Sequence, residues 1–230
     1  MPKVEILCIG SCRSALLPSI KYKILNFTYT HTTKEVIQLL EFVYSNIDKQ
    51  RLIKKEEFIL GSVNIQHVSK IRELCDNSEP VLIEISSIKE IKNNKGYYYN
   101  QWTVRDCIVN KKEHIEKNIT TTLATIDELK NDIEIIRGYF PDTKKIIFQS
   151  HINLDFEGMV SLNHITIIPP IQSRSLIDSA IRETSNIIHL IPRDIFKNLD
   201  WRKIVLSEDD TAHLNNEGYK ILANALDNIL

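Results

Sequence analysis

Short apolar segments rich in β-branched residues alternate along this chain with segments whose apolar residues recur at helical spacing. This alternation is typical of βαβ units, which build a mostly parallel sheet covered by helices on both faces. Five segments have the composition of buried strands, and they span 4–9, 24–29, 81–85, 145–149 and 187–191. The sequence therefore predicts an α/β protein with three α/β/α layers around a mostly parallel, five-stranded, flavodoxin-like sheet.

Two capping boxes mark the predicted helices. Thr32 is followed three residues later by Glu35, and Thr125 by Glu128, a spacing that satisfies backbone donors at the start of a helix. Apolar residues follow each box at intervals of three and four residues, which is the period of a buried helical face. Helices are predicted at about 33–47, 126–138, 176–184 and 216–230.

The chain has 230 residues, 43% of them hydrophobic, which is enough apolar material for one core, so a single domain spanning 1–230 is expected. The segment 88–119 has no clean period and contains the aromatic run Tyr97 to Tyr99 and Trp102. Long loops in compact domains are usually functional or mobile. We interpret this segment as an insertion that covers a substrate, with a plain surface excursion as the alternative.

The first predicted strand runs directly into Gly10, Ser11, Cys12, Arg13 and Ser14. Nucleophiles favour such strand-to-helix turns, because backbone N–H groups there stabilise a thiolate and later the oxyanion of a tetrahedral intermediate. A buried structural cysteine is the alternative for Cys12.

The other end of the chain carries Asp210 and His213 just before the last predicted helix. A carboxylate three residues before a histidine on a loop can orient the imidazole through one ring nitrogen and leave the other free to accept a proton. The alternative is a polar entry into the helix, with Asn216 as its cap.

Together the two ends of the chain resemble the SGNH (GDSL-like) hydrolase superfamily, which has a Gly-x-Ser turn after its first strand and Asp-x-x-His before its last helix. The sequence DTAHLNNEGYKILANAL is similar to the last block of that superfamily. The first block resembles the GSSR variant with Cys12 in place of serine, and also the GSCFA branch. The resemblance implies an SGNH hydrolase fold in which Cys12 is the nucleophile, His213 the general base and Asp210 its orienting group.

Two blocks of that superfamily are missing here. Its third block, Gly-x-Asn-Asp, supplies an oxyanion-hole asparagine, whereas the third predicted strand of this chain runs into Ser86 and Ser87. Ser87, or Asn153 after the fourth strand, is expected to donate in its place. The glycine of the second block is also absent, and Thr30, His31 and Thr32 stand at that point.

Several other polar residues follow predicted strands, where ligands bind in open α/β sheets. Ser11, Arg13 and His151 are candidates for oxyanion or substrate binding, although Arg13 also fits a plain solvated charge. His31, His151 and His164 lie near strand ends, but a lone histidine is more often structural. Glu84 lies inside a predicted strand, so it needs a partner or a raised pKa, unless the strand lies at an edge of the sheet.

These observations predict an acyl-ester hydrolase or O-acyltransferase that needs no cofactor and no metal. By analogy with the superfamily, the substrate is expected to be an ester, typically an acetyl group on a carbohydrate or surface polysaccharide. A transferase would take its acyl group from a thioester such as acyl-CoA. The rival from another class is a catalytically silent module that binds carbohydrate or protein, and the missing Gly-x-Asn-Asp block favours it.

Charge and cysteine content exclude other classes of function. The net charge is -1 with no basic cluster, which gives no electrostatic basis for binding nucleic acid. The chain has no apolar run near the roughly 20 residues that span a bilayer. Its four cysteines form no CxxC pair and no zinc-finger spacing, so free thiols and a cytoplasmic location are expected, and the oligomeric state is left open.

Overall fold

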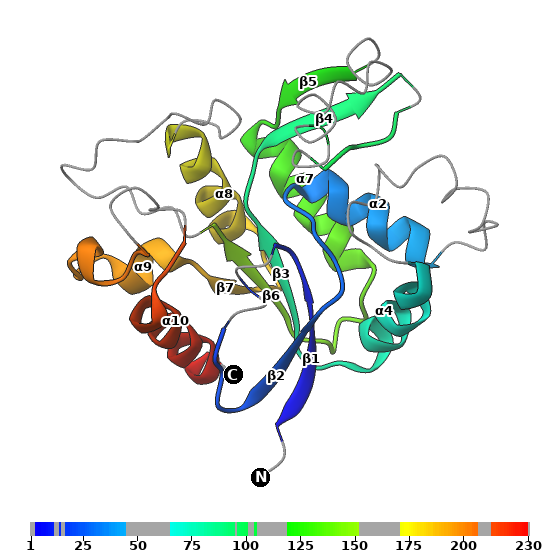
Figure 1. Cartoon of the computed structure of the whole chain (residues 1–230). Coiled ribbons are helices and arrows are strands. Elements are labelled where there is room, and N and C mark those ends of the chain that lie inside the picture. Colours follow the sequence, from blue (N-terminus) through cyan, green and yellow to red (C-terminus); the bar gives the residue numbers. More distant parts are fainter. Residues whose placement is uncertain are drawn as a thin grey trace.

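The computed structural model describes residues 3–11, 14, 17–44, 65–94, 96–100, 104, 119–151, 171–206 and 213–229. A five-stranded sheet lies at its centre (Figure 1). Its strands are β1 (Val4–Ile9), β2 (Tyr22–Asn26), β3 (Val81–Ile85), β6 (Ile146–Ser150) and β7 (Ile188–Leu190). All neighbouring pairs are parallel, so the predicted α/β fold with a parallel five-stranded sheet is confirmed.

The strands stand in the order β2-β1-β3-β6-β7, so the chain moves first to one side of β1 and then to the other. A sheet of this order has its topological switch point between β1 and β3, and ligands of open α/β sheets bind outside the carboxyl ends of the strands at that point. The fold alone therefore draws attention to the residues that follow β1 and β3.

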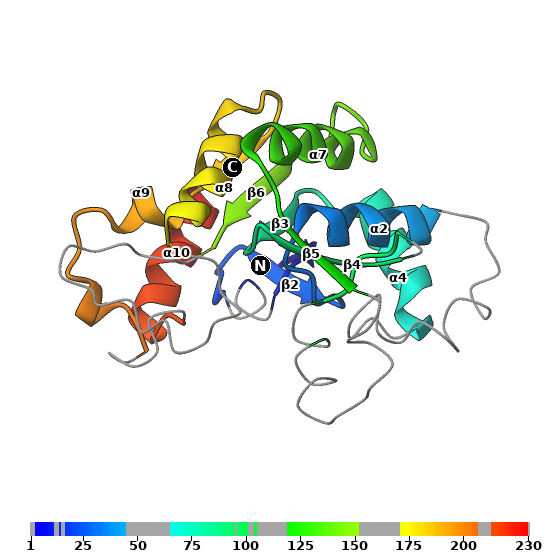
Figure 2. The same cartoon turned by 90° about the horizontal axis from the view of Figure 1, so that it is seen from above.

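Four helices cover one face of the sheet (Figure 2). They are α2 (Thr33–Tyr44), α4 (Ile65–Asn77), α7 (Ile126–Gly138) and α8 (Ile171–Glu183). Leu7, Ile9, Ile83 and Phe148 point to this face from the strands and are fully buried beneath the helices. The predicted strands are rich in apolar residues because the sheet is covered on both sides.

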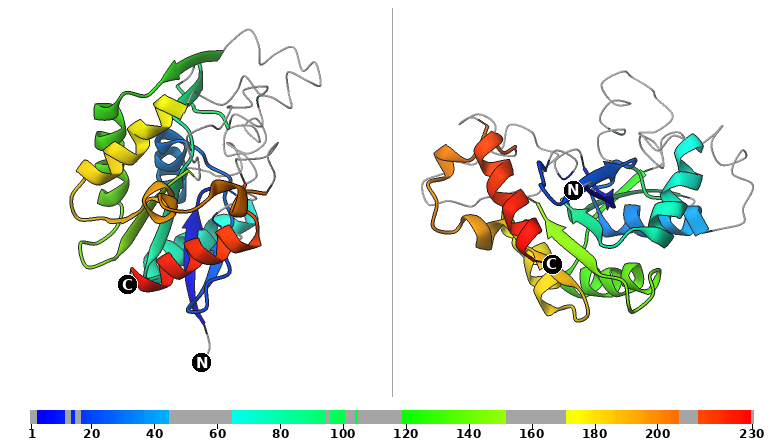
Figure 3. Two further views of the ribbon diagram at one scale, coloured as in Figure 1. Left: turned by 90° about the vertical axis from the view of Figure 1, so that its left-hand side faces the viewer. Right: turned by 90° about the horizontal axis from the view of Figure 1, so that it is seen from below.

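The opposite face is covered mainly by α10 (Asn216–Asn228), with α9 (Pro192–Phe196) and the 3-10 turn η1 (Trp201–Lys203) beside it. Figure 3 shows α10 across the sheet from α7 and α8. Cys8, Leu82 and Ile147 point to this face, alternating with the residues that face the other layer. No helix in the described ranges is both long and apolar enough to cross a membrane.

The direction of α10 follows from contacts in its last turn. Asp227 accepts hydrogen bonds from the Ser19 hydroxyl (2.5 Å) and the Ile20 amide (3.0 Å), and both residues lie just before the first residue of β2. The last turn of α10 is therefore near the amino ends of the strands. Its first turn lies towards their carboxyl ends, on the side of the switch point.

A separate antiparallel pair, β4 (Lys89–Asn93) and β5 (Ile119–Leu123), occupies the described ends of the predicted insertion. The chain turns at Gly96, which has φ +91°, and residues 97–100 return along β4. The Gln38 side chain fastens this return to α2: it accepts from the Tyr98 amide (2.8 Å) and donates to the Tyr98 carbonyl (3.0 Å). Residues 97–100 are therefore anchored to α2 and β4.

Some predicted boundaries were wrong. The second strand was predicted at 24–29 but ends at Asn26, because the Asn26 side chain accepts a hydrogen bond from the Thr28 amide (2.8 Å) and turns the chain. The helix predicted from 176 begins at Ile171. Helix α4 was not predicted, although Val68, Ile71 and Cys75 follow one another at helical spacing and are buried.

Candidate active site at the carboxyl edge of the sheet

The turn after β1 lies against β3 at the switch point. A Cβ atom added to Gly10 would lie 2.6 Å from the Cβ of Glu84, so only glycine leaves room for the Glu84 side chain at this position. The strand pairing places Gly10 beside Glu84, and both belong to the face that α10 covers. The sequence Gly10-Ser11 is therefore explained by a close approach of two strands.

Glu84 holds the residues that begin this turn. Its Oε2 atom accepts hydrogen bonds from the Ser11 amide (3.1 Å), the Ser11 hydroxyl (2.7 Å) and the Ser14 hydroxyl (2.6 Å). Glu84 is fully buried in β3, the central strand, so the alternative that its strand lies at an edge of the sheet was wrong. A buried carboxylate is tolerated only with such partners, and here the partners are the residues on either side of the turn.

Gln149 is a second buried polar residue, next to Glu84. It is the register partner of Glu84 on β6 and is fully buried. Its two amide atoms and the Oε1 atom of Glu84 have no hydrogen-bond partner among the described residues. The signal for both residues was visible in the sequence as a polar side chain inside an apolar strand, but only the register shows that the two are adjacent.

Four of the predicted site residues, Cys12, Arg13, Asn153 and Asp210, lie outside the described residues, as do His164 and Trp102. The described cysteines are of a different kind. Burial, reinforced by the charge of Glu84, raises the pKa of the Cys8 thiol well above its usual range. Burial likewise raises the pKa of Cys75 to about 12. Both are free thiols packed in the core, which suits structural cysteines and not nucleophiles.

His213 is half-buried and lies two residues before the N-cap of α10. Its carbonyl accepts from the Leu206 amide (2.9 Å), and Leu214 forms a bridge with Val205. The cap itself is Asn215, whose side chain accepts from the Glu217 and Gly218 amides, so the expectation that Asn216 caps this helix was wrong. Because the first turn of α10 faces the carboxyl edge, His213 lies on the side of the molecule where β1 ends.

Ser87 follows β3 and is buried. The backbone amides of Ser86 and Ser87 both donate to the His31 carbonyl, at 2.8 and 2.9 Å. The Ser87 hydroxyl oxygen accepts from the Lys89 amide (3.0 Å), which fixes the start of β4. The hydroxyl proton is thus the donor that Ser87 retains for the predicted oxyanion role. His151, which follows β6, is also buried at this edge.

His31 belongs to a buried cluster with Glu35 and Asn100. The Asn100 amide nitrogen donates to the Tyr29 carbonyl (2.6 Å) and the Glu35 carboxyl (3.2 Å) and lies 3.0 Å from the Nδ1 atom of His31. The Tyr29 carbonyl fixes the orientation of the amide, so its NH2 group, and not its oxygen, faces the His31 ring. His31 was a candidate from its position after a predicted strand, whereas Asn100 was not predicted.

Burial raises the pKa of Glu35 in this cluster to about 8, against the opposing effect of hydrogen bonds from His31, Asn100 and Thr32. The capping role predicted for this pair holds in part: the Thr32 hydroxyl accepts from the Glu35 amide (3.2 Å), while the Glu35 carboxylate accepts from the His31 amide (3.1 Å). The cluster ties the entry of α2 to the insertion.

The described residues contain no group of three or more His, Cys, Asp or Glu side chains placed to bind a metal ion. The carboxyl edge does contain Ser11 and Ser14, which are hydrogen-bonded to the buried Glu84 at the switch point, and a histidine that enters the last helix from the same side. An arrangement of this kind suits nucleophilic chemistry assisted by a base.

The chain was also compared with known proteins. No family model matches the chain, and no curated protein matches it. Among solved structures, the chain is similar to a crystal structure of a candidate GDSL-like lipase from Parabacteroides merdae, with 12% sequence identity and a TM-score of 0.46 over 99% of this chain and 98% of that one.

Proposed function

We propose that this chain is an acyl-transfer enzyme of the SGNH type in which Cys12 is the nucleophile, His213 the general base and Asp210 the group that orients the histidine. One observation carries the proposal: the residues on both sides of Cys12 are hydrogen-bonded to the buried Glu84 at the switch point of the sheet. A fixed turn at that point is where a nucleophile and its oxyanion donors are needed together.

The reaction has two steps. The Cys12 thiolate attacks the ester carbonyl carbon, a C–S bond forms, and the C–O bond breaks as the leaving alcohol takes the proton that His213 had accepted from the thiol. Water or another hydroxyl then gives its proton to His213 and attacks the thioester. The acid or the new ester leaves, and the Cys12 sulfur regains the proton.

The substrate in this proposal is an acetyl ester on a carbohydrate, or another acyl ester, and the reaction needs no cofactor. If the enzyme transfers its acyl group, the donor is a thioester of the acyl-CoA class. Cys8 and Cys75 are both free thiols, in keeping with the cytoplasmic location that we include in the proposal.

A silent binding module is the second candidate, and a specific observation favours it. The amides of Ser86 and Ser87, at the place where the superfamily has its oxyanion-hole block, both donate to the His31 carbonyl. An SGNH-type fold without those donors would keep a pocket and lose turnover.

Hydrolysis of p-nitrophenyl acetate separates the two candidates. If the chain is an acyl-transfer enzyme, the Cys12→Ala variant loses all activity above background. The Cys12→Ser variant keeps a fraction of the parent activity, since the same base activates a hydroxyl. His213→Ala is expected to lower kcat/KM by about 10²- to 10⁴-fold, the usual worth of a general base. Cys75→Ala, which removes a buried thiol elsewhere, is the control and keeps full activity. Equal activity in the parent and Cys12→Ala proteins would leave the binding module as the function.

A further inference from the structure

A second polar cleft lies between β4, β5 and the first turns of α2 and α7. It has a volume of about 350 Å³ and is lined by Lys34, Glu90, Lys92, Tyr98, Thr122 and Glu128, among others. This volume is at the lower end of the roughly 300–1,000 Å³ of small-molecule sites. The cleft borders the helical layer that covers Leu7 and Ile9, whereas Glu84 faces the α10 layer.

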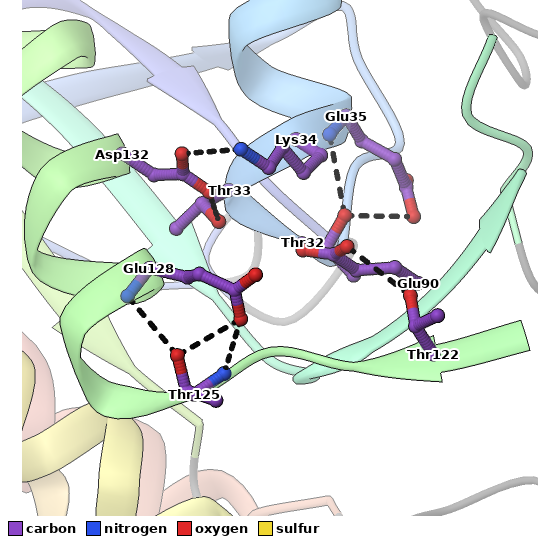
Figure 4. Close-up of polar contacts among 9 residues, drawn as sticks. All are labelled: Thr32, Thr33, Lys34, Glu35, Glu90, Thr122, Thr125, Glu128 and Asp132. Carbon is purple, nitrogen blue, oxygen red and sulfur yellow. Dashed lines mark hydrogen bonds and ion pairs between the residues drawn. The ribbon is translucent and has the colours of Figure 1, made fainter. Parts of the chain in front are cut away.

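Three carboxylates gather around this cleft, and two of them accept hydrogen bonds shorter than 3 Å from the protein (Figure 4). Asp132 accepts from the Thr33 hydroxyl (2.7 Å) and forms an ion pair with Lys34 (2.7 Å). Glu128 forms the capping box of α7 with Thr125, accepting from its amide at 2.8 Å. Neither carboxylate therefore needs a ligand.

Glu90 differs from the other two. Its residue is 8% exposed, its Oε2 atom has only a long contact with the Thr122 hydroxyl (3.5 Å), and its Oε1 atom has no hydrogen-bond partner among the described residues. Figure 4 shows the Glu90 carboxylate lying between β4 and the first turns of α2 and α7. A buried acceptor without a partner costs free energy, and a hydrogen-bond donor from a ligand would remove that cost.

The charges around the cleft decide what kind of donor fits. The lining carries two lysines and two glutamates, and Lys34 is already paired with Asp132. An anionic ligand would meet Glu90 and Glu128, and a cationic one would meet Lys92, whose ammonium lies 5.8 Å from the centre of the Tyr98 ring. A neutral ligand with several hydroxyls satisfies both kinds of group, because each hydroxyl both donates and accepts.

The walls of the cleft are also held in place. Tyr98 is fastened through its backbone to the Gln38 side chain, and β4 and β5 are paired along all five of their residues. A site that is formed before binding loses little entropy when the ligand arrives. The cleft thus combines rigid walls, charged groups of both signs and one buried acceptor that has no partner among the described residues.

We propose that this cleft binds a neutral saccharide unit, with Glu90 accepting from its hydroxyls and Thr122 and Lys92 completing the contacts. The proposal does not rest on the acyl-transfer function, because it concerns a different layer of the molecule and a binding event without chemistry.

Ligand-observed NMR on the full chain tests this proposal. The probes are sugars with the same type of ring that are neutral, negatively charged or positively charged. The neutral probes are glucose, galactose, mannose and N-acetylglucosamine, and the charged ones are glucuronate and glucosamine. We expect at least one neutral sugar to bind with a dissociation constant on the order of 1 mM, and more tightly than either charged sugar. Glu90→Ala should weaken that binding by about tenfold or more, because a hydrogen bond to a charged group is lost.

Two further variants keep the test decisive. Thr122→Val changes an exposed strand residue, so the fold is retained while one contact is lost, and binding should weaken by a smaller factor. Glu73→Gln, on the exposed side of α4, is the matched control and should bind like the parent. Preferred binding of glucuronate or glucosamine, neutral binding unchanged in Glu90→Ala, or no binding of any neutral probe at concentrations about tenfold above 1 mM would each overturn the proposal.

Discussion

Glu35 shows what burial does to a single side chain in this fold. Its carboxyl group is fully enclosed by α2 and the insertion, and its pKa is raised to about 8, whereas an unfolded chain leaves it near about 4.3. The folded state therefore binds more protons than the unfolded state between these two values. It follows that the stabilising effect of the protonated group is complete below the lower value and is lost as the pH rises towards the higher one.

We predict that the free energy of unfolding of the parent protein falls by up to about 1.4 kcal/mol per pH unit across this range from this group alone. Glu35→Gln should remove that slope, because an amide keeps the acceptor for the His31 and Asn100 donors and does not ionise. Urea unfolding at about pH 5.5 and about pH 7.5 measures the difference. Glu41→Gln, an exposed change on the same helix, is the control. Parallel profiles for the parent and Glu35→Gln would contradict the assignment.

Glu84 acts through the hydrogen bonds that it accepts. Its Oε2 atom accepts three hydrogen bonds from Ser11 and Ser14, the residues that flank the proposed nucleophile. Glu84→Gln is expected to lower the free energy of unfolding by about 1–3 kcal/mol, since a buried charged acceptor is replaced by a group that also brings two donors. Thermal unfolding gives the stability, and esterase assays of the fraction that remains folded give the effect on the turn. A variant as stable and as active as the parent would show that Glu84 does not hold the turn.

Two glycines, one at the end of a strand and one in a helix, differ in their surroundings: the first lies in close packing between strands, and the second has open space around it. A methyl group on Gly10, at the end of β1, would meet the Glu84 side chain at 2.6 Å, whereas one on Gly138, in α7, would meet nothing within 4 Å. Gly10→Ala should therefore destabilise the protein by about 1–3 kcal/mol through overpacking. Gly138→Ala should be neutral or stabilise it by up to about 1 kcal/mol, because alanine is the better helix former.

Denaturant unfolding of the two variants side by side checks this prediction. A Gly10→Ala protein as stable as Gly138→Ala would mean that β1 and β3 are not as close at the switch point as the structure has them.

The same elements show what sequence can and cannot predict. Strand β1 and helix α7 were predicted almost to the residue, because the first is apolar except for Glu5 and the second starts with a capping box that forms as expected. Helix α4 was missed because its polar residues outweigh its buried stripe. Strands β4 and β5 were missed because their pairing is between segments about 30 residues apart, and their composition of lysine, asparagine and threonine is not that of a buried strand.

At the scale of the whole molecule, the fold class followed from the alternation of strands and helices, but the site did not follow to the same extent. Position after a strand directed attention to Ser11 and Ser87, whose predicted roles in oxyanion or substrate binding stay predictions. It gave no indication that Glu84 and Gln149 are adjacent or that Asn100 reaches His31, because these contacts depend on register and on the path of the insertion. Residues that meet only through tertiary packing leave no local pattern in the sequence.

The central claim concerns Cys12, and cysteine reactivity tests it most directly because the chain contains its own controls. Cys8 and Cys75 are buried thiols with raised pKa values, so both should resist iodoacetamide until the protein unfolds. A thiolate at the start of the turn after β1, beside a histidine, should instead react at neutral pH, since a free thiol has a pKa of about 8.5 and such surroundings lower it by about one unit or more.

The measurement is the rate of alkylation at each cysteine, followed by peptide mass spectrometry, in the parent protein, in His213→Ala and in Asp210→Asn. The account predicts that Cys12 is labelled at least about tenfold faster than Cys8 and Cys75, and that His213→Ala slows the labelling of Cys12 while leaving the other two unchanged. Asp210→Asn should slow it to a smaller extent. A Cys12 that reacts only on unfolding, at the same rate as Cys8, would contradict the account.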